Sequence, residues 1–389
     1  MADAPIYLDY AATAAIRPPE VADAMMAYLR DVGATPGRAG HSRAVEAGRV
    51  AFRCRRALAR LFGVRGDPGR IAFQLNATHA LNVALQGVLR PGDRVVRTSY
   101  DHNAVRRPVA ALARIGVAET VLGGDADGSF DLNEAERALA GARLLVLSHA
   151  SNVLGTVAPV AELAARAHAH GALVLVDASQ SAGHIPVDVE AMGIDLLAFT
   201  GHKGLLGPQG TGGLYVREGI EIEPIFAGGT GGESGPIGMP ESMPDRLEAG
   251  TQNGPGIAGL LAGVEWVLER GVESIHVRQS ALKSRLRERL SIVPGLRLLS
   301  PAAPEGAGIV TVTVDGIDPS RMAARLDRDF GVMTRAGLHC APEAHRILGT
   351  EATGAVRFSV GWATTEAEVD RAAGAVAALA AETMAARAG

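Results

Sequence analysis

The sequence contains very little lysine, although it is rich in arginine. Lysine occurs only at Lys203 and Lys283, whereas lysine and arginine together number 38. Where a simple positive charge is sufficient, this chain has used arginine. A lysine in such a chain therefore indicates a role that arginine cannot take, such as losing a proton and forming an imine with an aldehyde.

The sequence also lacks the features that mark several classes of protein. The formal net charge is -4 and the arginines form no basic stripe, which argues against nucleic acid or an anionic membrane as the main partner. No apolar run reaches the length of a membrane span, and the N-terminal residues lack the pattern of a signal peptide. Two cysteines in 389 residues are typical of a reducing compartment. We therefore expect a soluble cytoplasmic protein that acts on a small molecule.

Short apolar runs alternate with helical patterns through the first half of the chain. The runs are apolar on both faces, as in strands of a parallel sheet that is covered on both sides. With 47% hydrophobic residues the chain can bury a large core. This alternation predicts an α/β domain with a mainly parallel sheet flanked by helices, and with its ligand at the carboxyl ends of the strands. The predicted strands are 70–75, 93–98, 143–151, 172–179 and 195–201.

The pattern changes after about residue 220, where the Gly/Pro-rich segment 227–245 predicts a long functional loop. A helix-rich stretch follows at about 256–291. Apolar runs and a final helix then indicate a smaller α+β domain, and "TEAE" (365–368) has the pattern of a capping box at the start of that helix. We predict a large domain of residues 16–264, and a small domain formed by residues 1–15 and 265–389.

The two lysines differ in their surroundings. Lys283 lies in a charged amphipathic helix pattern, where we expect it to face solvent. Lys203 lies between the apolar run ending at Phe199 and a glycine-rich turn, and Asp177 ends the preceding predicted strand. Pyridoxal phosphate needs this pair, because the carboxylate keeps its pyridine nitrogen protonated while the lysine binds its aldehyde. The segment 76–78 leads into a helix whose N-terminus could bind the phosphate.

Five segments of the sequence resemble the class V aminotransferase family, and within it the cysteine desulfurases and selenocysteine lyases. They are "YLDYAAT", "SHASNVLGT", "VDASQSAGH", "FTGHKGLLGPQGTGGLY" and "RAGLHCAP". The resemblance covers nearly the whole chain. It implies a pyridoxal phosphate-dependent transferase of fold-type I, which forms a homodimer with active sites at the subunit interface.

The resemblance also implies roles for individual residues. It assigns the covalent link with the cofactor to Lys203, the pyridine nitrogen to Asp177, and stacking on the ring to His102. From the residues alone His102 could equally be a loop histidine, Asn152 a turn cap and Arg357 a surface residue. The resemblance further implies that the cofactor phosphate is bound by Ala77, Thr78, Thr200 and His202, and that the phosphate of the partner subunit is bound by Thr251. It places Asn152 and Gln180 near the phenolic oxygen of the cofactor and the substrate. The substrate would be bound by Arg335 and, through its carboxylate, by Arg357.

The type of reaction depends on a second group, for which Cys340 is the candidate. It lies in a polar loop with Arg335, His339 and His345 nearby in sequence, and neighbouring positive charge makes a thiol a better nucleophile by lowering its pKa. Cys54 lies in an amphipathic helix pattern that is typical of an inert cysteine. We therefore predict a cysteine desulfurase that forms L-alanine from L-cysteine, leaves the sulfur on Cys340 as a persulfide and passes it to an acceptor protein.

Several alternatives stay open at this stage. A selenocysteine or C–S lyase, an epimerase or an aminotransferase acting on a small amino acid could use the same cofactor residues. Leu338 stands where desulfurases often have histidine, and the loop 227–245 is longer than a minimal desulfurase needs. A non-catalytic binding protein and a nucleotide-binding loop are less well supported, since the glycine run lacks the Gly-Lys-Ser/Thr ending of a P-loop. His168 and His170 have no acidic or cysteine partner at a metal-ligand spacing, and we expect no metal.

Overall fold

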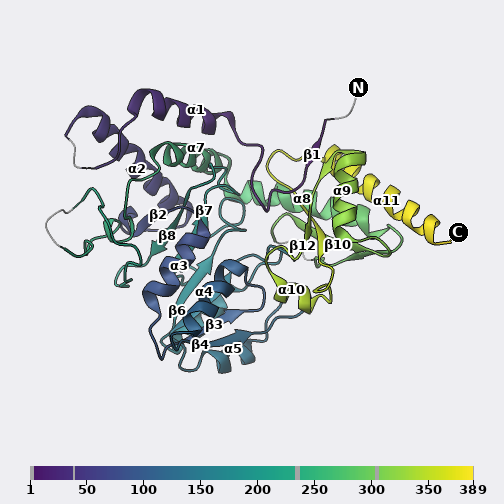
Figure 1. Ribbon diagram of the computed structural model, residues 1–389, viewed down its shortest axis with the longest axis horizontal. Coiled ribbons are helices and arrows are strands. Elements are labelled where there is room, and N and C mark those ends of the chain that lie inside the picture. Colours follow the sequence, from purple (N-terminus) through teal and green to yellow (C-terminus); the bar gives the residue numbers. More distant parts are fainter. Residues whose placement is uncertain (1–3, 38–39, 233–236, 303–305, 389) are drawn as a thin grey trace.

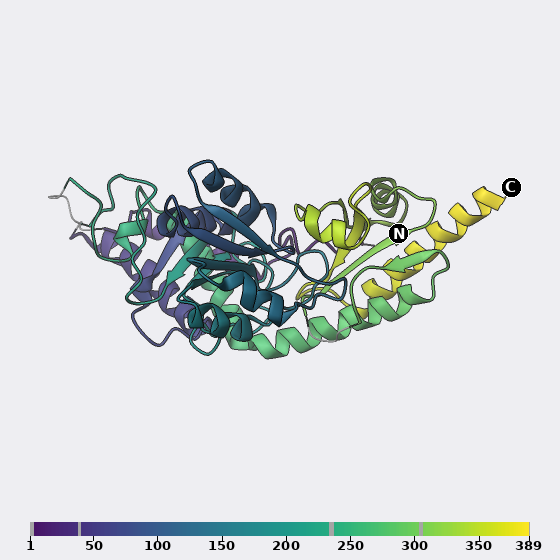
Figure 2. The same cartoon turned by 90° about the horizontal axis from the view of Figure 1, so that it is seen from below.

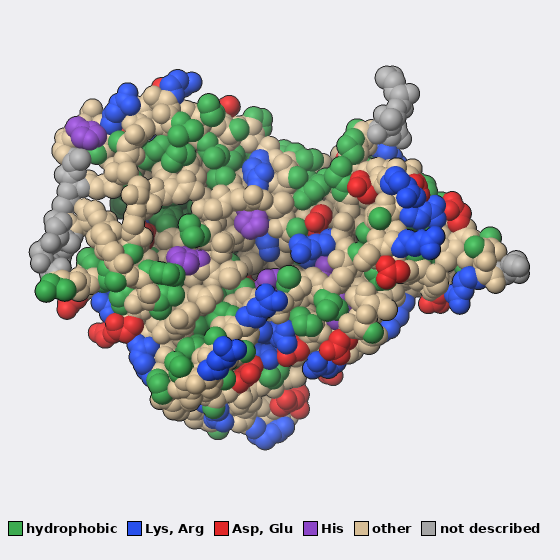
Figure 3. All heavy atoms as spheres, in the orientation of Figure 1, with side chains coloured by type: hydrophobic (Ala, Val, Ile, Leu, Met, Phe, Trp, Pro, Cys, Tyr) green, Lys and Arg blue, Asp and Glu red, His purple; other side chains and the backbone are tan. Residues whose placement is uncertain are grey.

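The computed structural model describes residues 4–37, 40–232, 237–302 and 306–388 (Figure 1). Residues 233–236 of the Gly/Pro-rich loop therefore lie outside the described residues. The chain forms a larger part around a seven-stranded sheet and a smaller part around a four-stranded sheet. On the face shown in Figure 3, the side chains of basic residues lie among those of acidic residues.

The seven-stranded sheet has the order β2-β8-β7-β6-β5-β3-β4. The strand pairs from β7 to β4 are all parallel, whereas β8 runs antiparallel to both of its neighbours. The prediction of a mainly parallel sheet is therefore confirmed. Its strands are Ile71–Gln74 (β2), Arg94–Thr98 (β3), Ala118–Leu122 (β4), Leu144–Ser148 (β5), Leu173–Asp177 (β6), Leu196–Thr200 (β7) and Gly212–Val216 (β8).

Helices cover both faces of this sheet, which explains why its central strands are apolar on both sides. One core cluster joins α2, α5, α6 and α7 to the sheet, and a second joins α3 and α4 to the opposite face. None of the helices in the described part of the chain is both long and apolar enough to cross a membrane. The helices are Pro19–Ala27 (α1), which continues as the π-helical turn Tyr28–Val32 (η1), Ser42–Leu61 (α2), Ala77–Val88 (α3), Asn103–Ala113 (α4), Leu132–Leu139 (α5), Val160–Ala169 (α6) and Gly254–Arg270 (α7), with 3-10 turns at Pro68–Arg70 (η2) and Asp245–Leu247 (η3).

The glycine-rich segment after Lys203, which the sequence indicates as a turn, also contains the strand β8. The turn is present after Lys203, but Gly212 begins the fully buried strand β8. Gly213 has no room for a side chain, since an added Cβ would lie 2.3 Å from the ring of Phe199. The absent side chains allow β8 to pack closely, and the same absence removes the alternating pattern by which a strand is recognised.

The smaller part contains the C-terminal third of the chain together with its N-terminal segment. Ile6 and Leu8 share a core cluster with residues of α8, β10, β13 and α11. In Figure 2, α8 runs along the lower edge of the molecule, and it follows directly after α7 of the larger part. The domain boundaries given above stay a prediction. The elements are Ile6–Tyr7 (β1), Val272–Ser291 (α8), Leu296–Leu298 (β9), Ile309–Val314 (β10), Pro319–Phe330 (α9), Val332–Met333 (β11), Arg335–Gly337 (β12), Pro342–Ile347 (α10), Ala355–Ser359 (β13) and Glu366–Ala388 (α11).

The expectation that Lys283 faces solvent is wrong. Lys283 is only 2% exposed, and burial lowers its pKa to about 8. The chain near Gly306 covers it, because a Cβ added at Gly306 would lie 3.1 Å from Lys283 Nζ. The charged helix pattern could not reveal this, since the covering segment is distant in sequence.

The capping box before α11 is confirmed and supports a stability prediction. The N–H of Thr365 donates to Glu368 Oε2 at 2.7 Å, and the N–H of Glu368 donates to Thr365 Oγ1 at 3.2 Å. We expect Thr365→Ala to lower the free energy of unfolding by about 1 kcal/mol, measured by urea denaturation. Thr365→Ser keeps the hydroxyl and should match the wild type. Equal stability of the alanine variant would show that the cap contributes nothing.

Candidate active site

A cavity of about 300 Å³ lies at the carboxyl ends of β2, β3, β5, β6 and β7, where the smaller part closes over the sheet. This is the edge at which ligands bind in open α/β sheets. Residues far apart in the sequence meet there, and they come from both parts of the molecule. The residues predicted for the site that line this cavity are Ala77, Thr78, His102, Asn152, Asp177, Gln180, Thr200, His202, Lys203, Arg335 and Arg357.

Lys203 and Asp177 occupy this cavity on neighbouring strand ends. Asp177 is the last residue of β6, and its Oδ1 accepts the N–H of Ser179 at 2.9 Å. Lys203 follows the end of β7 and is half-buried. Burial lowers the pKa of Lys203 to about 8, although the Asp177 carboxylate acts in the opposite direction. At neutral pH an appreciable fraction of this lysine is therefore an uncharged amine, the form that attacks an aldehyde.

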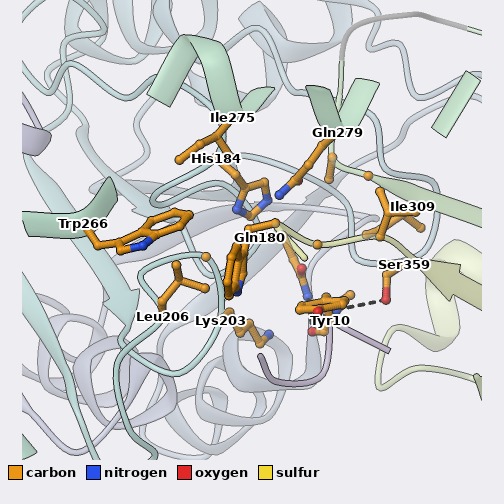
Figure 4. Close-up of a pocket in the computed structure, with 17 residues that line it drawn as sticks. Tyr10, Gln180, His184, Lys203, Leu206, Trp266, Ile275, Gln279, Ile309 and Ser359 are labelled. Carbon is orange, nitrogen blue, oxygen red and sulfur yellow. Dashed lines mark hydrogen bonds between the residues drawn. The ribbon is translucent and has the colours of Figure 1, made fainter. Parts of the chain in front are cut away.

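The glycines beside Lys203 allow the chain to pack tightly at this position. A Cβ on Gly204 would lie 2.2 Å from Nδ1 of His184, and one on Gly263 of α7 would lie 2.3 Å from the carbonyl oxygen of Leu205. The prediction of a close-packed turn is confirmed for this segment. Figure 4 shows a smaller cavity beside it, with Lys203 below Gln180 and His184.

The opposite end of the main cavity is suited to an anion. Asn76 caps α3, and its Oδ1 accepts the N–H of His79 at 2.9 Å, so the N–H groups of Ala77 and Thr78 remain at the open helix end. The buried Thr200 Oγ1 has no hydrogen-bond partner among the described residues. This hydroxyl is therefore available to donate a hydrogen bond to a ligand. These groups together fit a phosphate.

Two of the histidines that line the cavity, His102 and His202, are uncharged at neutral pH. Burial lowers the pKa of His202 to about 4, and its Nδ1 lies 3.1 Å from Thr13 Oγ1. His102 precedes α4 and caps it, because its Nδ1 accepts the N–H of Ala104 at 3.0 Å. Burial also lowers the pKa of His102, so its ring borders the cavity as a neutral aromatic surface.

Arg357 is held by two groups from distant parts of the chain. Its side chain is 2% exposed, with Nη1 donating to the carbonyl oxygen of Asn152 at 3.1 Å and Nη2 to Asp9 Oδ1 at 2.9 Å. The surface alternative for Arg357 is therefore wrong. Its Nε is buried with no partner among the described residues, which leaves a donor for an anionic ligand. Asp9 was not singled out from the sequence, because nothing in its spacing relates it to Arg357.

Cys340 lies beside the cavity on a turn with unusual backbone geometry. His339 and Cys340 have φ values of 51° and 59°, and the N–H of Ala341 donates to the carbonyl oxygen of Leu338 at 2.9 Å. Left-handed backbone costs roughly 1–2 kcal/mol for each non-glycine residue. The turn is attached to the larger part at two points, since Asn152 Nδ2 donates to the His339 carbonyl at 2.6 Å and the N–H of Asn103 donates to the Cys340 carbonyl at 2.7 Å.

The source of positive charge near Cys340 differs from the expectation. His339 and His345 are both buried, and burial lowers the pKa of His339 to about 3 and that of His345 to about 4. They therefore contribute no charge at neutral pH. The guanidinium of Arg357 lies close enough to Cys340 for the two groups to interact electrostatically. Cys54, in contrast, is fully buried in α2, and burial raises its pKa, as expected of an inert cysteine.

The remaining residues considered from the sequence lie elsewhere. Thr251 does not border the main cavity, but lines a separate one that also contains Phe226. His168 Nε2 lies 2.9 Å from Asp195 Oδ2, and His170 Nε2 lies 2.7 Å from Glu136 Oε1. These two histidines take part in hydrogen bonds on the surface of the larger part.

Comparison with known proteins places this site in a family context. The family described as "Aminotransferase class-V" matches residues 6–372. A relative from Methanothermobacter thermautotrophicus named "Probable cysteine desulfurase" is 35% identical over 94% of this chain and 92% of its own length. "Probable cysteine desulfurase 2" from Mycobacterium leprae is 36% identical over 94% and 89%, respectively.

A solved structure agrees over almost the entire fold. The apo structure of a cysteine desulfurase from Thermococcus onnurineus NA1 is 33% identical to this chain, with a TM-score of 0.91 over 97% of this chain and 95% of the other. The predicted fold class and the family resemblance are both confirmed by these findings. This chain belongs to the class-V aminotransferase family.

Proposed function

We propose that this chain is a pyridoxal phosphate-dependent cysteine desulfurase that converts L-cysteine to L-alanine. The observation that carries the proposal is the cavity in which Lys203, Asp177 and Arg357 meet beside the turn that bears Cys340. The relatives named as cysteine desulfurases support the choice of substrate. A lyase or an aminotransferase would need the first three residues but not the cysteine.

The residues around the cavity fit this cofactor. The open N-terminus of α3 and the unpartnered Thr200 hydroxyl suit its phosphate, and Asp177 suits its pyridine nitrogen. Lys203 provides the amine that binds its aldehyde. When bound, pyridoxal phosphate supplies an electron sink for bonds broken at the substrate. The neutral ring of His102 would cover the cofactor.

The other residues would bind the substrate and move protons. Arg357 and Arg335 would hold the substrate carboxylate, with Arg357 fixed in position by Asp9. Asn152 and Gln180 would contact the substrate and the cofactor oxygen. Lys203, with its pKa lowered to about 8, is suited to accept the proton from the substrate Cα.

The transfer of sulfur balances without an external oxidant or reductant. The Cys340 thiolate attacks the substrate sulfur, an S–S bond forms and the substrate C–S bond breaks. The electron pair of that bond remains with Cβ, which takes up a proton, so that L-cysteine and the Cys340 thiol give L-alanine and a Cys340 persulfide. An acceptor protein with a thiol would then remove the outer sulfur.

The proposal extends to assembly and location. We propose a homodimer in which Thr251 reaches the phosphate site of the second copy, because it lies outside the cavity of its own chain. We also propose that the reaction takes place in the cytoplasm, since both cysteines are free thiols, as is usual in a reducing compartment.

Replacing the cysteine tests the reaction type. We expect Cys340→Ala to keep the visible absorbance of the bound cofactor but to form alanine from L-cysteine at least about 100-fold more slowly, because the sulfur has lost its acceptor. Cys54→Ala is the matched control and should retain full activity. Cysteine sulfinate and selenocysteine should be assayed in parallel, with alanine and the released sulfur or selenium product measured. Undiminished alanine and sulfide formation from cysteine by Cys340→Ala would instead favour a C–S lyase.

The lowered pKa of Lys203 predicts how the apoprotein binds its cofactor. Only the neutral amine of Lys203 reacts with the aldehyde. The rate constant for binding of pyridoxal phosphate to the apoprotein should therefore rise roughly tenfold between about pH 7 and about pH 9 and then level off. An ordinary lysine would give a steeper rise without a plateau in this range. Stopped-flow absorbance measures the rate, and Lys203→Ala, which should form no borohydride-sensitive band, is the control. A rate that does not depend on pH would contradict this role of the amine.

A further inference from the structure

The turn that carries Cys340 is strained, and something must keep it in place. His339 and Cys340 are consecutive residues with positive φ, in a turn where asparagine and glycine are the usual choice. Such geometry persists only where the surrounding structure fixes it. The hydrogen bonds of Asn152 and Asn103 hold the carbonyl groups of the turn, but they leave the His339 side chain to be fixed from another side.

A chain of hydrogen bonds continues from the His339 ring into the smaller part. His339 Nε2 lies 3.1 Å from the Arg335 carbonyl oxygen, and His339 Nδ1 lies 3.1 Å from His345 Nε2. His345 Nδ1 lies 2.8 Å from Thr350 Oγ1. Both rings are almost completely buried, with exposures of 4% and 0%, so water does not compete for these groups.

The carbonyl oxygen of Arg335 at one end of this series of hydrogen bonds determines which atom donates in each of them. A carbonyl oxygen can only accept, so His339 carries its proton on Nε2 and accepts at Nδ1. His345 must then donate from Nε2 and accept at Nδ1 from the Thr350 hydroxyl. The lowered pKa values of both histidines agree with one proton on each ring. One arrangement of protons therefore satisfies all three side chains.

We propose that His345 and Thr350 are positioning residues for the sulfur transfer, which fix the His339 ring and thereby hold the Cys340 turn in its strained conformation. Neither residue borders the cavity that contains Lys203. Thr350 is itself fixed, because its N–H donates to the His345 carbonyl at 2.8 Å and its carbonyl accepts the N–H of Gly354 at 2.7 Å. This inference rests on the proposed desulfurase function, since it concerns the attack by Cys340.

Removal of the ring donor should separate sulfur transfer from the chemistry at Cα. We expect His345→Leu to lower kcat for alanine formation from L-cysteine roughly 10- to 100-fold, because a small displacement of the thiol has a large effect on the rate. KM should change little, and so should the rate at which Cα of L-alanine exchanges its hydrogen in D2O, which needs Lys203 but not Cys340. His345→Gln restores a donor near Nε2 and should recover much of the rate.

Three further variants complete the test. His168→Leu removes a histidine bonded to the buried Asp195 far from the turn, and it should leave kcat unchanged even if it lowers stability. If His345→Leu does not fold, Thr350→Val tests the same role. We expect it to lower kcat for alanine formation by a smaller factor, and Thr350→Ser to restore kcat. Hydrogen exchange of the peptide containing Ala341 should be faster in His345→Leu and Thr350→Val.

The outcomes distinguish this inference from the proposed function. Wild-type kcat in folded His345→Leu and Thr350→Val overturns the positioning role, as does an equal loss of Cα exchange and alanine formation. If the wild type forms no alanine from cysteine, the proposed desulfurase function fails. In that case the hydrogen-exchange measurement still tests whether His345 and Thr350 hold the turn, and unchanged exchange overturns the structural step.

Discussion

The buried guanidinium of Arg357 joins the two parts of the molecule, and the geometry of the cavity depends on it. A charge that is almost completely removed from water must be paired and hydrogen-bonded. Arg357 meets this requirement through Asp9 in the N-terminal segment and the carbonyl of Asn152 after β5. These contacts bring the start of the chain, the sheet edge and β13 to one point. The cavity is the space that remains between them.

Near Arg357, several of the basic side chains carry no charge at neutral pH. Burial keeps His102, His202, His339 and His345 neutral at neutral pH, each for lack of sufficient stabilising charge nearby. The cations are the arginines that face the substrate end and a lysine that is partly deprotonated. A site arranged in this way can hold anionic groups at both ends while its histidines act as neutral rings and hydrogen-bond partners.

Much of the fold was accessible from the sequence because it depends on local patterns. Strands buried on both faces are apolar throughout, and helix starts such as Asn76 and Thr365 carry capping side chains. The strand β8 was not predicted from the sequence. Its close packing requires Gly212 and Gly213, and glycines give no pattern of apolar side chains by which a strand is recognised. The burial of Lys283 was not predicted either, because Gly306, which lies against this lysine, is not part of its helix.

The sequence by itself determined which chemical groups the chain carries and that they follow strand ends, because residue type and local spacing are written along the chain. It thus pointed to Lys203, Asp177 and Cys340 before any contact was known. Only the tertiary structure decided that Asp9 pairs with Arg357, that the histidines near Cys340 are neutral, and that Thr350 and His345 form a chain of bonds to the cysteine turn. These properties depend on burial and on contacts between distant segments, neither of which has a local signal.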